Sequence, residues 1–332
     1  MPELRQNPAT KEWVIFAPER KRRPEDFREK FNLITQPSYK SECPFCLGNE
    51  HLTSEDLLYY QSKQKGQWEI RVVPNKYPAL IPKGNFTRKN LSDFYRKMEN
   101  ALGSHEIIIE TPIHNTILGL ISDEHMKHIL QLYKERYLSL CKAGYKLVTI
   151  FRNYGEAAGT SLEHPHSQII ATPIVPNSIR YPIEEAMRYY DDNGGCVYCD
   201  MINQELVAQE RIVLQGRKFI VFEPFAARLP YETWIMPVSH AASFGSINSE
   251  EIDELAQFLN RILKIFYEKL NNPAYNYVIQ SVPCNSEKNL FFHWSLVILP
   301  RLTKFAGFEL GSGMKINHIF PEKCASILRD EI

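Results

Sequence analysis

The sequence predicts a mixed α+β fold built as two tandem halves, and three observations support this expectation. The order of strand-like and helix-like segments occurs twice along the chain. Each copy opens with a Cys-x-x-Cys pair and closes with a histidine in front of an apolar run. A length of 332 residues suits about two domains, and an apolar fraction of 44% allows a proper core. We expect a first half over residues 1–175 and a second half over residues 176–332.

The elements of the first half follow the pair Cys43 and Cys46. The helix should begin after the cap residue Ser122, because apolar and aromatic residues then recur with helical spacing. They are Met126, Ile129, Tyr133 and Tyr137. The expected elements are strands within 68–80 and 105–114, a helix over 123–142, and strands within 145–153 and 164–173.

The second half repeats this order after Cys196 and Cys199. Its helix should begin after Asn248 or Ser249. The helical apolar positions are Ile252, Leu255, Leu259, Ile262 and Phe266. The expected elements are strand segments at 211–224 and 231–240, a helix over 250–270, and strands within 275–282 and 293–300. The segment 171–182 contains three prolines and is expected to join the halves.

Two Cys-x-x-Cys pairs in one chain suggest metal ligation before disulfides in a protein that is not secreted. A single pair could instead be two small core residues or a redox motif. Each half also has two histidines at matching places, so we expect two closed Cys₂His₂ groups, each holding a structural zinc ion. The expected ligands are Cys43, Cys46, His114 and His164, then Cys196, Cys199, His240 and His293. The remaining cysteines, Cys141, Cys284 and Cys324, are expected to be ordinary core or surface thiols.

Charge and hydropathy exclude several classes of protein. The formal net charge is zero, which gives no global positive field to hold nucleic acid. No apolar run approaches the ~20 residues of a membrane span, and the N-terminal residues lack the apolar core of a signal peptide. We therefore expect a soluble, cytoplasmic protein that binds neither nucleic acid nor membrane.

His166 is left over once His164 is assigned to a metal. The matching position of the second half holds Ser295, so the additional imidazole is not a shared structural requirement. Pro165 restricts the region to an edge strand, a strand start or a bulge. His166 is therefore the candidate nucleophile.

The motifs "CPFC" and "HPHSQ", the duplication and the ending "PRLTKFAGFELGSG" together resemble the galactose-1-phosphate uridylyltransferase family of the histidine-triad superfamily. The resemblance covers nearly the whole chain. It implies two histidine-triad-like halves, each an antiparallel sheet with a packed helix, in a homodimer. It also implies a ping-pong nucleotidyltransferase, in which a histidine takes the nucleotide from a nucleotide sugar and passes it to a sugar 1-phosphate.

The resemblance implies roles for the residues of "HPHSQ". His166 would attack the α-phosphate, and a fixed acceptor for its other ring nitrogen would hold the reactive tautomer. The backbone carbonyl of His164, held by zinc, is the expected acceptor. Gln168 would share a face with His166 and contact the phosphate as a neutral donor.

The resemblance also assigns substrate contacts elsewhere. The phosphate loop would use Asn153, Gly159 and Ser161, although the same residues could form a plain turn. The N-terminal arginine motif would reach the nucleotide site of the dimer, although it could also be a solvated basic run. The expected residues are Arg20 and Arg23 in that motif, Asn75 near the nucleoside, and Lys304 with Phe305 by the hexose.

The chain departs from the best-known uridylyltransferases in its second metal site. They use a glutamate and histidines that include an H-x-H, where this chain has a second Cys-x-x-Cys and "HWS". Its tail resembles a branch with a plant ADP-glucose phosphorylase. UDP-glucose with galactose 1-phosphate is the leading expectation for the substrates, and ADP-glucose with phosphate is the alternative. A nucleotide hydrolase of the superfamily and a zinc-stapled binding module are the other open interpretations.

Overall fold

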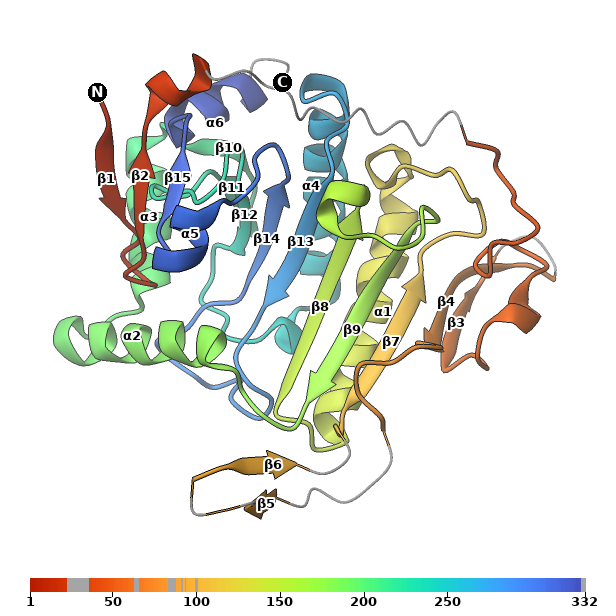
Figure 1. Ribbon diagram of the computed structural model, residues 1–332. Coiled ribbons are helices and arrows are strands. Elements are labelled where there is room, and N and C mark those ends of the chain that lie inside the picture. Colours follow the sequence, from red (N-terminus) through yellow and green to blue (C-terminus); the bar gives the residue numbers. More distant parts are fainter. Residues whose placement is uncertain are drawn as a thin grey trace.

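The computed structural model describes residues 1–22, 36–62, 66–82, 88–90, 92, 94–98 and 101–329. Over these residues the largest feature is one antiparallel sheet of ten strands (Figure 1). In spatial order the strands are β10 (Ile212–Gln215), β11 (Phe219–Phe222), β12 (Thr233–Pro237), β14 (Ser295–Pro300), β13 (Tyr275–Gln280), β8 (Leu147–Tyr154), β9 (His166–Thr172), β7 (Ser104–Ile109), β4 (Trp68–Pro74) and β3 (Leu58–Gln61).

Each half of the chain supplies five neighbouring strands in the same arrangement. From edge to centre the first half runs β3-β4-β7-β9-β8 and the second runs β10-β11-β12-β14-β13. The halves meet where β8 pairs antiparallel with β13. The predicted repeat is therefore present, and one continuous sheet runs through it. The division of the chain at residue 175 stays a prediction.

One long helix from each half packs on the same face of this sheet. α1 (Asp123–Lys142) and α4 (Ser249–Lys269) lie side by side behind the strands in Figure 1. The Ser122 hydroxyl accepts the N–H of His125, and Asn248 forms a capping box with Glu251. Each cap stabilises its helix by about 1 kcal/mol. The predicted α+β class, with an antiparallel sheet and a packed helix in each half, is confirmed.

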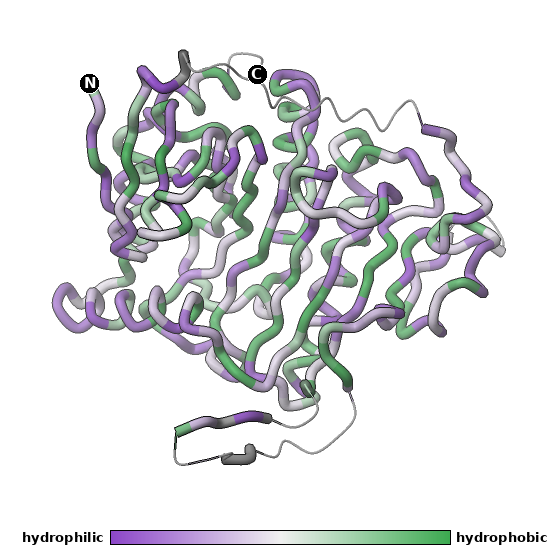
Figure 2. The backbone as a smooth tube through the Cα atoms, viewed as in Figure 1, coloured by the Kyte–Doolittle hydropathy of each residue, from purple (hydrophilic) through white to green (hydrophobic). Residues whose placement is uncertain are grey.

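The opposite face of the sheet is covered unevenly. In the second half α2 (Asn177–Asn193) and α3 (Val197–Ala208) cover it, and Ile202 shares a buried cluster with Trp234 and Val297. In the first half the Cys43–Cys46 segment packs near Ile109, while the adjacent outward positions of β8 and β9 stay half-buried. Figure 2 shows hydrophobic residues along the central strands and hydrophilic ones along α2.

The remaining elements are short. The strands β1 (Glu3–Gln6), β2 (Trp13–Phe16) and β15 (Lys315–Asn317) form a second sheet, and β5 (Arg88–Asn90) pairs with β6 (Arg96–Met98). The other helical segments are η1 (Pro18–Arg22), η3 (Glu50–Leu52), η4 (Leu118–Leu120), η5 (Glu156–Ala158), η6 (Phe244–Ser246), α5 (Gly307–Ser312) and α6 (Pro321–Arg329). Within the described ranges, no helix combines the length and apolarity that a membrane crossing requires.

Two expectations about the joint and the cysteines need correction. The segment 171–182 is not only a connection, because α2 begins inside it at Asn177 and includes Pro182. Cys141 and Cys284 are not ordinary thiols but form a disulfide with Cα atoms 5.3 Å apart. The two residues belong to different halves and are separated by 143 positions, so the sequence pattern gave no sign of their contact. Cys324 is a buried cysteine, as expected.

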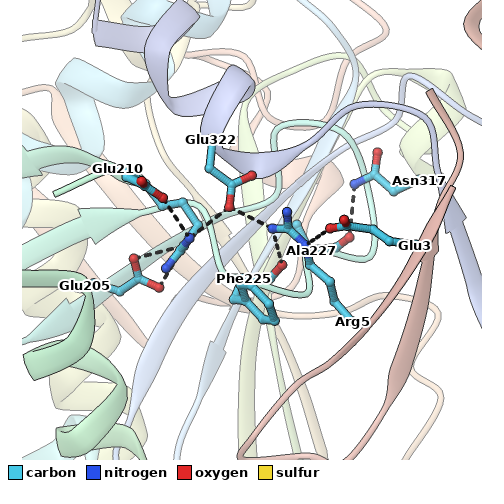
Figure 3. A network of polar contacts seen from close by, with 9 residues as sticks. Glu3, Arg5, Glu205, Glu210, Phe225, Ala227, Asn317 and Glu322 are labelled. Carbon is cyan, nitrogen blue, oxygen red and sulfur yellow. Dashed lines mark hydrogen bonds and ion pairs between the residues drawn. The ribbon is translucent and has the colours of Figure 1, made fainter. Parts of the chain in front are cut away.

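A polar network joins the two ends of the chain (Figure 3). The Glu322 carboxylate on α6 accepts hydrogen bonds from Arg5 on β1 at 2.7 Å and from Arg211 at 2.8 Å. The Arg211 guanidinium also donates to Glu205 on α3 at 3.0 Å. The Arg5 guanidinium lies 4.5 Å from the ring centroid of Phe225. The Glu322 carboxylate therefore bridges the two guanidinium groups and offsets the repulsion between their charges.

We expect Glu322→Ala to lower the free energy of unfolding by about 2 kcal/mol, because it leaves both arginines without their shared carboxylate. Glu210→Ala is the matched control, since this more exposed carboxylate also approaches Arg211, at 3.7 Å. Its loss should cost less than about 0.5 kcal/mol. Thermal midpoints of the two variants measure the difference, and equal midpoints would contradict this role of the network.

Candidate active site and metal centres

Two Cys₂His₂ groups lie among the residues that the structure describes, and their ligand atoms lie within 4.8 Å of one another. The first contains Cys43, Cys46, His114 and His164. Its Sγ–Nδ1 distances are 3.5 Å for Cys46–His114, 3.6 Å for Cys46–His164 and 3.7 Å for Cys43–His164. Bond lengths of about 2.3 Å to sulfur and about 2.1 Å to nitrogen place neighbouring ligand atoms of a tetrahedral zinc ion about 3.6 Å apart. The group therefore fits such an ion.

Surrounding groups hold these ligands in place. The Asn49 amide donates to the carbonyls of Lys40, Ser41 and Cys43 at 2.8–3.1 Å, which fixes the turn that carries the cysteines. His164 Nε2 lies 2.7 Å from the Thr111 carbonyl. A carbonyl can only accept, so Nε2 is protonated and Nδ1 presents its lone pair to the metal position. Burial lowers the pKa of His164 to about 3, which keeps the ring neutral.

The second group contains Cys196, Cys199, His240 and His293. Nδ1 again faces the sulfurs, at 3.4 Å for Cys199–His240 and 3.6 Å for Cys199–His293. The Nε2 of His240 lies 3.0 Å from the Asn289 carbonyl. His293 precedes β14 as His164 precedes β9, so the two groups occupy equivalent places in the repeat. Both groups could hold a metal ion.

His166 opens β9, directly after Pro165, and its ring is held from two sides. Its Nδ1 lies 2.8 Å from the backbone carbonyl of His164. Phe45 contacts the ring edge-on, with centroids 5.3 Å apart. Because the carbonyl fixes the proton on Nδ1, Nε2 carries the free lone pair. Among the described residues, Nε2 has no hydrogen-bond partner. Burial and the nearby Arg152 lower the pKa of His166 to about 4, against that hydrogen bond.

Ser167 points to the opposite face of the sheet. Its hydroxyl lies 2.7 Å from the Tyr133 hydroxyl of α1, and the residue is fully buried. The alternation of a regular strand therefore separates His166 from its neighbouring hydroxyl.

A buried polar cluster lies beneath His166 on the helix side of the sheet. Arg152 and Glu110 form an ion pair with exposed fractions of 1% and 0%. Arg152 also donates to the carbonyl of His166 at 3.2 Å, and the Tyr133 hydroxyl donates to Glu110 at 3.1 Å. Removing one partner of such a buried pair destabilises the fold, because the other charge is left buried and unpaired. Through its hydrogen bond to the His166 carbonyl, Arg152 also holds the backbone of β9. No pattern in the sequence pointed to this pair, although Arg152 occupies an inward position of an alternating strand.

Gln168 shares the outward face of β9 with His166. Its Oε1 lies 2.7 Å from Nε2 of His105 on β7. Asn75 follows β4, and its backbone N–H donates to the carbonyl of His105 at 2.8 Å. The structure therefore brings together two residues that the resemblance assigned, Gln168 and Asn75, with His105 between them. No pattern in the sequence pointed to His105.

Asn153 lies near the end of β8, two residues beyond Phe151, the partner of Gln168, and next to the turn that contains Gly159 and Ser161. Its Oδ1 accepts a 2.8 Å hydrogen bond from Asn276 of β13, whose amide also donates to the Ala158 carbonyl at 2.8 Å. Gly159 has a φ of +82°, which requires glycine there. Its N–H is used by the Glu156 carbonyl at 2.8 Å, so that group is not open to an anion. Ser161 is exposed.

The remaining predicted contacts lie further away along the chain. Lys304 and Phe305 belong to the loop between β14 and α5, where Lys315 lies 4.4 Å above the Phe305 ring. The register places this loop at the sheet edge of Asn153, because Pro300 pairs with Tyr275 and Tyr275 with Tyr154. Arg20 is exposed in η1, beside the small sheet and away from β9 in Figure 1. Arg23 lies outside the described residues.

In the second half, Ser295 occupies the position of His166. Ser295 is 2% exposed and His166 is 7% exposed, so both side chains are buried. The imidazole is therefore present at this position in the first half and replaced by a hydroxyl in the second.

Comparisons with known proteins agree on one family. A family model described as the N-terminal domain of galactose-1-phosphate uridyl transferase matches residues 1–176. The ADP-glucose phosphorylase of Arabidopsis thaliana is 33% identical, over 99% of this chain and 93% of its own length. The galactose-1-phosphate uridylyltransferase of Thermotoga maritima is 31% identical, over 99% and 98%. The crystal structure of the Arabidopsis ADP-glucose phosphorylase with bound ADP-glucose superposes with a TM-score of 0.84 and 31% identity, covering 100% of both chains.

We expect the purified protein to carry about two metal ions per chain, because each group fits a closed tetrahedral site. Cys43→Ser and Cys196→Ser should each remove one ion, and both should lower the thermal midpoint, since such sites contribute to folding. Metal analysis measures the stoichiometry. Cys324→Ser, at a buried cysteine outside both groups, should keep both ions. Full metal content in both ligand variants would show that the assignment is wrong.

Proposed function

The chain belongs to the galactose-1-phosphate uridyl transferase family, and from this premise we propose that it is a nucleotidyltransferase acting through a covalent nucleotidyl-histidine. The observation that carries the proposal is the 2.8 Å contact from His166 Nδ1 to the His164 carbonyl. It leaves Nε2 unprotonated on an outward position of the first half. This arrangement suits nucleophilic attack on a phosphorus atom and requires no separate base.

The reaction balances with the groups of the substrates alone. The Nε2 lone pair forms a bond to the α-phosphorus of a nucleotide sugar, and the bond from that phosphorus to the bridging oxygen breaks. The electron pair leaves with the sugar 1-phosphate, which is already an anion and needs no proton to depart. In the second step an oxygen of the acceptor phosphate attacks the same phosphorus, and the N–P bond breaks. The neutral His166 is thereby restored.

Neutral amides next to His166 would stabilise the phosphate in both steps. Gln168 is two residues away along β9 on the same face, and Asn153 lies on the neighbouring strand β8. An amide N–H donates to a phosphoryl oxygen without taking a proton from the reaction. Arg20 and Arg23 would complete the nucleotide site of a homodimer, and Lys304 with Phe305 would contact the sugar.

We assign zinc to both Cys₂His₂ groups. Two thiolates with two imidazoles form the donor set that zinc prefers, and four protein ligands leave no position for substrate. The ion of the first group would hold His164, whose carbonyl positions His166. Its role is structural, with no bond of the reaction made at the metal.

Two pairs of substrates remain candidates. UDP-glucose with galactose 1-phosphate is the leading pair, supported by the family model and by relatives named uridylyltransferases. ADP-glucose with phosphate is the second, supported by the Arabidopsis relative and its complex with ADP-glucose. Both pairs use the same transfer through His166.

We expect His166→Gly to lower turnover by more than about 1,000-fold while the metal content stays at the wild-type level, because His166 supplies the nucleophile but no metal bond. Wild-type protein incubated with nucleotide sugar labelled in the α-phosphate, without acceptor, should retain label. The linkage should be acid-labile and base-stable, as in a phosphoramidate. Free imidazole should restore part of the reaction of His166→Gly by filling the vacated space.

Ser167→Ala is the matched control for the site of labelling. The Ser167 hydroxyl faces α1, so this variant should still become labelled. Loss of label in Ser167→Ala, mapping of the label to Ser167, or near-normal transfer by His166→Gly would each contradict the proposed mechanism.

A panel of donors and acceptors decides between the two pairs. UDP-glucose and ADP-glucose are each tested with galactose 1-phosphate, glucose 1-phosphate and inorganic phosphate, and product formation is followed by chromatography. We expect turnover of UDP-glucose with galactose 1-phosphate. Turnover of ADP-glucose with phosphate alone would overturn the leading pair and keep the mechanism. Release of nucleoside monophosphate without any acceptor would instead indicate a hydrolase.

A further inference from the structure

His105 is half-buried on β7 and contacts two residues of the candidate site. Its Nε2 lies 2.7 Å from Gln168 Oε1, and the backbone nitrogen of Ala79 lies 3.2 Å from its Nδ1. The Asn75 amide nitrogen is nearly equidistant from the ring nitrogens, at 3.1 Å from Nε2 and 3.5 Å from Nδ1. Such distances place that amide over the face of the ring, so it leaves the in-plane positions to Ala79 and Gln168.

The directions of the hydrogen bonds from Ala79 through His105 to Gln168 follow from one fixed donor. The backbone N–H of Ala79 can only donate, so Nδ1 of His105 accepts and carries no proton. The proton of the neutral ring is then on Nε2, which donates to Gln168. The oxygen of the Gln168 amide is therefore bound to His105, and its NH₂ group remains for another partner.

We propose that His105 is a positioning residue that sets the polarity of Gln168, so that the amide presents N–H donors and not its oxygen to the transferred phosphate. The inference rests on the proposed function of His166. An unrestrained glutamine amide can rotate by half a turn and would then point a carbonyl oxygen at a phosphoryl oxygen. His105 excludes that orientation, because it would bring two N–H donors together at 2.7 Å.

The position of His105 supports a role through Gln168. Along β7 and β9, His105 is paired with Ile170 and Ile107 with Gln168, so His105 lies two residues from the residue opposite Gln168. His166 lies two residues from Gln168 in the other direction along β9. His105 and His166 therefore lie on opposite sides of Gln168, and His105 binds the Gln168 amide from the side away from the proposed nucleophile.

Two isosteric variants separate a donor from an acceptor at the Nε2 position. His105→Gln can still donate an N–H to Gln168, whereas His105→Glu offers only acceptors in a side chain of the same shape. The readout is the single-turnover rate of protein labelling, with UDP-glucose and with ADP-glucose labelled in the α-phosphate. We expect His105→Gln to stay within about 3-fold of the wild type and His105→Glu to fall about 100-fold, the worth of a hydrogen bond to a charged group.

The same pair is then measured in a Gln168→Ala background. If His105 acts through Gln168, the labelling rates of the two variants should differ in this background by no more than about 3-fold. The difference that remains measures the effect of the negative charge that His105→Glu adds. Metal content and thermal midpoint identify a loss of fold. Should His105→Glu not fold, His105→Ala takes its place, with an expected fall of about 10-fold in the Gln168 background and none in Gln168→Ala.

Equal rates for His105→Gln and His105→Glu in the Gln168 background would overturn the proposal, as would an undiminished difference in Gln168→Ala. Steady-state transfer is measured alongside labelling. If the wild type transfers nucleotide without forming the acid-labile label, the covalent step of the proposed function is wrong. The ratio of the transfer rates of the two variants then still decides the role of His105.

Discussion

The site depends on one hydrogen bond, from Nδ1 of His166 to the backbone carbonyl two residues earlier. That carbonyl belongs to His164, whose side chain lies in the first Cys₂His₂ group. His164 thus gives its side chain to a group that could hold a metal ion, and its backbone to the proposed nucleophile. A shift of this residue would change the tautomer and the direction of the neighbouring imidazole together. This link would explain why a closed Cys₂His₂ group lies so close to the proposed nucleophile.

Strand β9 turns this constraint into a two-sided arrangement. Its outward positions carry His166 and Gln168, and its inward position carries Ser167 in contact with α1. The Arg152–Glu110 pair lies on the inward side and reaches the carbonyl of His166. His166 is therefore held on the inward side by the buried Arg152–Glu110 pair, and at its ring by the His164 carbonyl.

The second half also holds residues of the candidate site in place. Through β13 it supplies Asn276, whose amide oxygen accepts from Arg301 and whose nitrogen donates to Asn153. Because an arginine can only donate, the Asn276 oxygen faces Arg301 and the Asn276 NH₂ group donates to the Asn153 oxygen. The NH₂ group of Asn153 is then directed away from Asn276. Gln168 and Asn153 therefore both offer donors on the same face of the sheet, and each is oriented by a residue of a different strand. A neutral pair of donors suits an anion that must be held and then released.

The sequence by itself determined the repeat, the two long helices α1 and α4, the cap Ser122, and the residues of the two Cys₂His₂ groups, because each depends on spacing along the chain. It also separated His166 from His164 by comparing the halves. The sequence could not show the contacts between distant strands. His105, the Arg152–Glu110 pair, Asn276 and the Cys141–Cys284 disulfide emerge only when β7, β8, β9 and β13 become neighbours in one sheet. Pairing register decides which side chains meet, and a local pattern carries no information about the register of strands far apart in the chain.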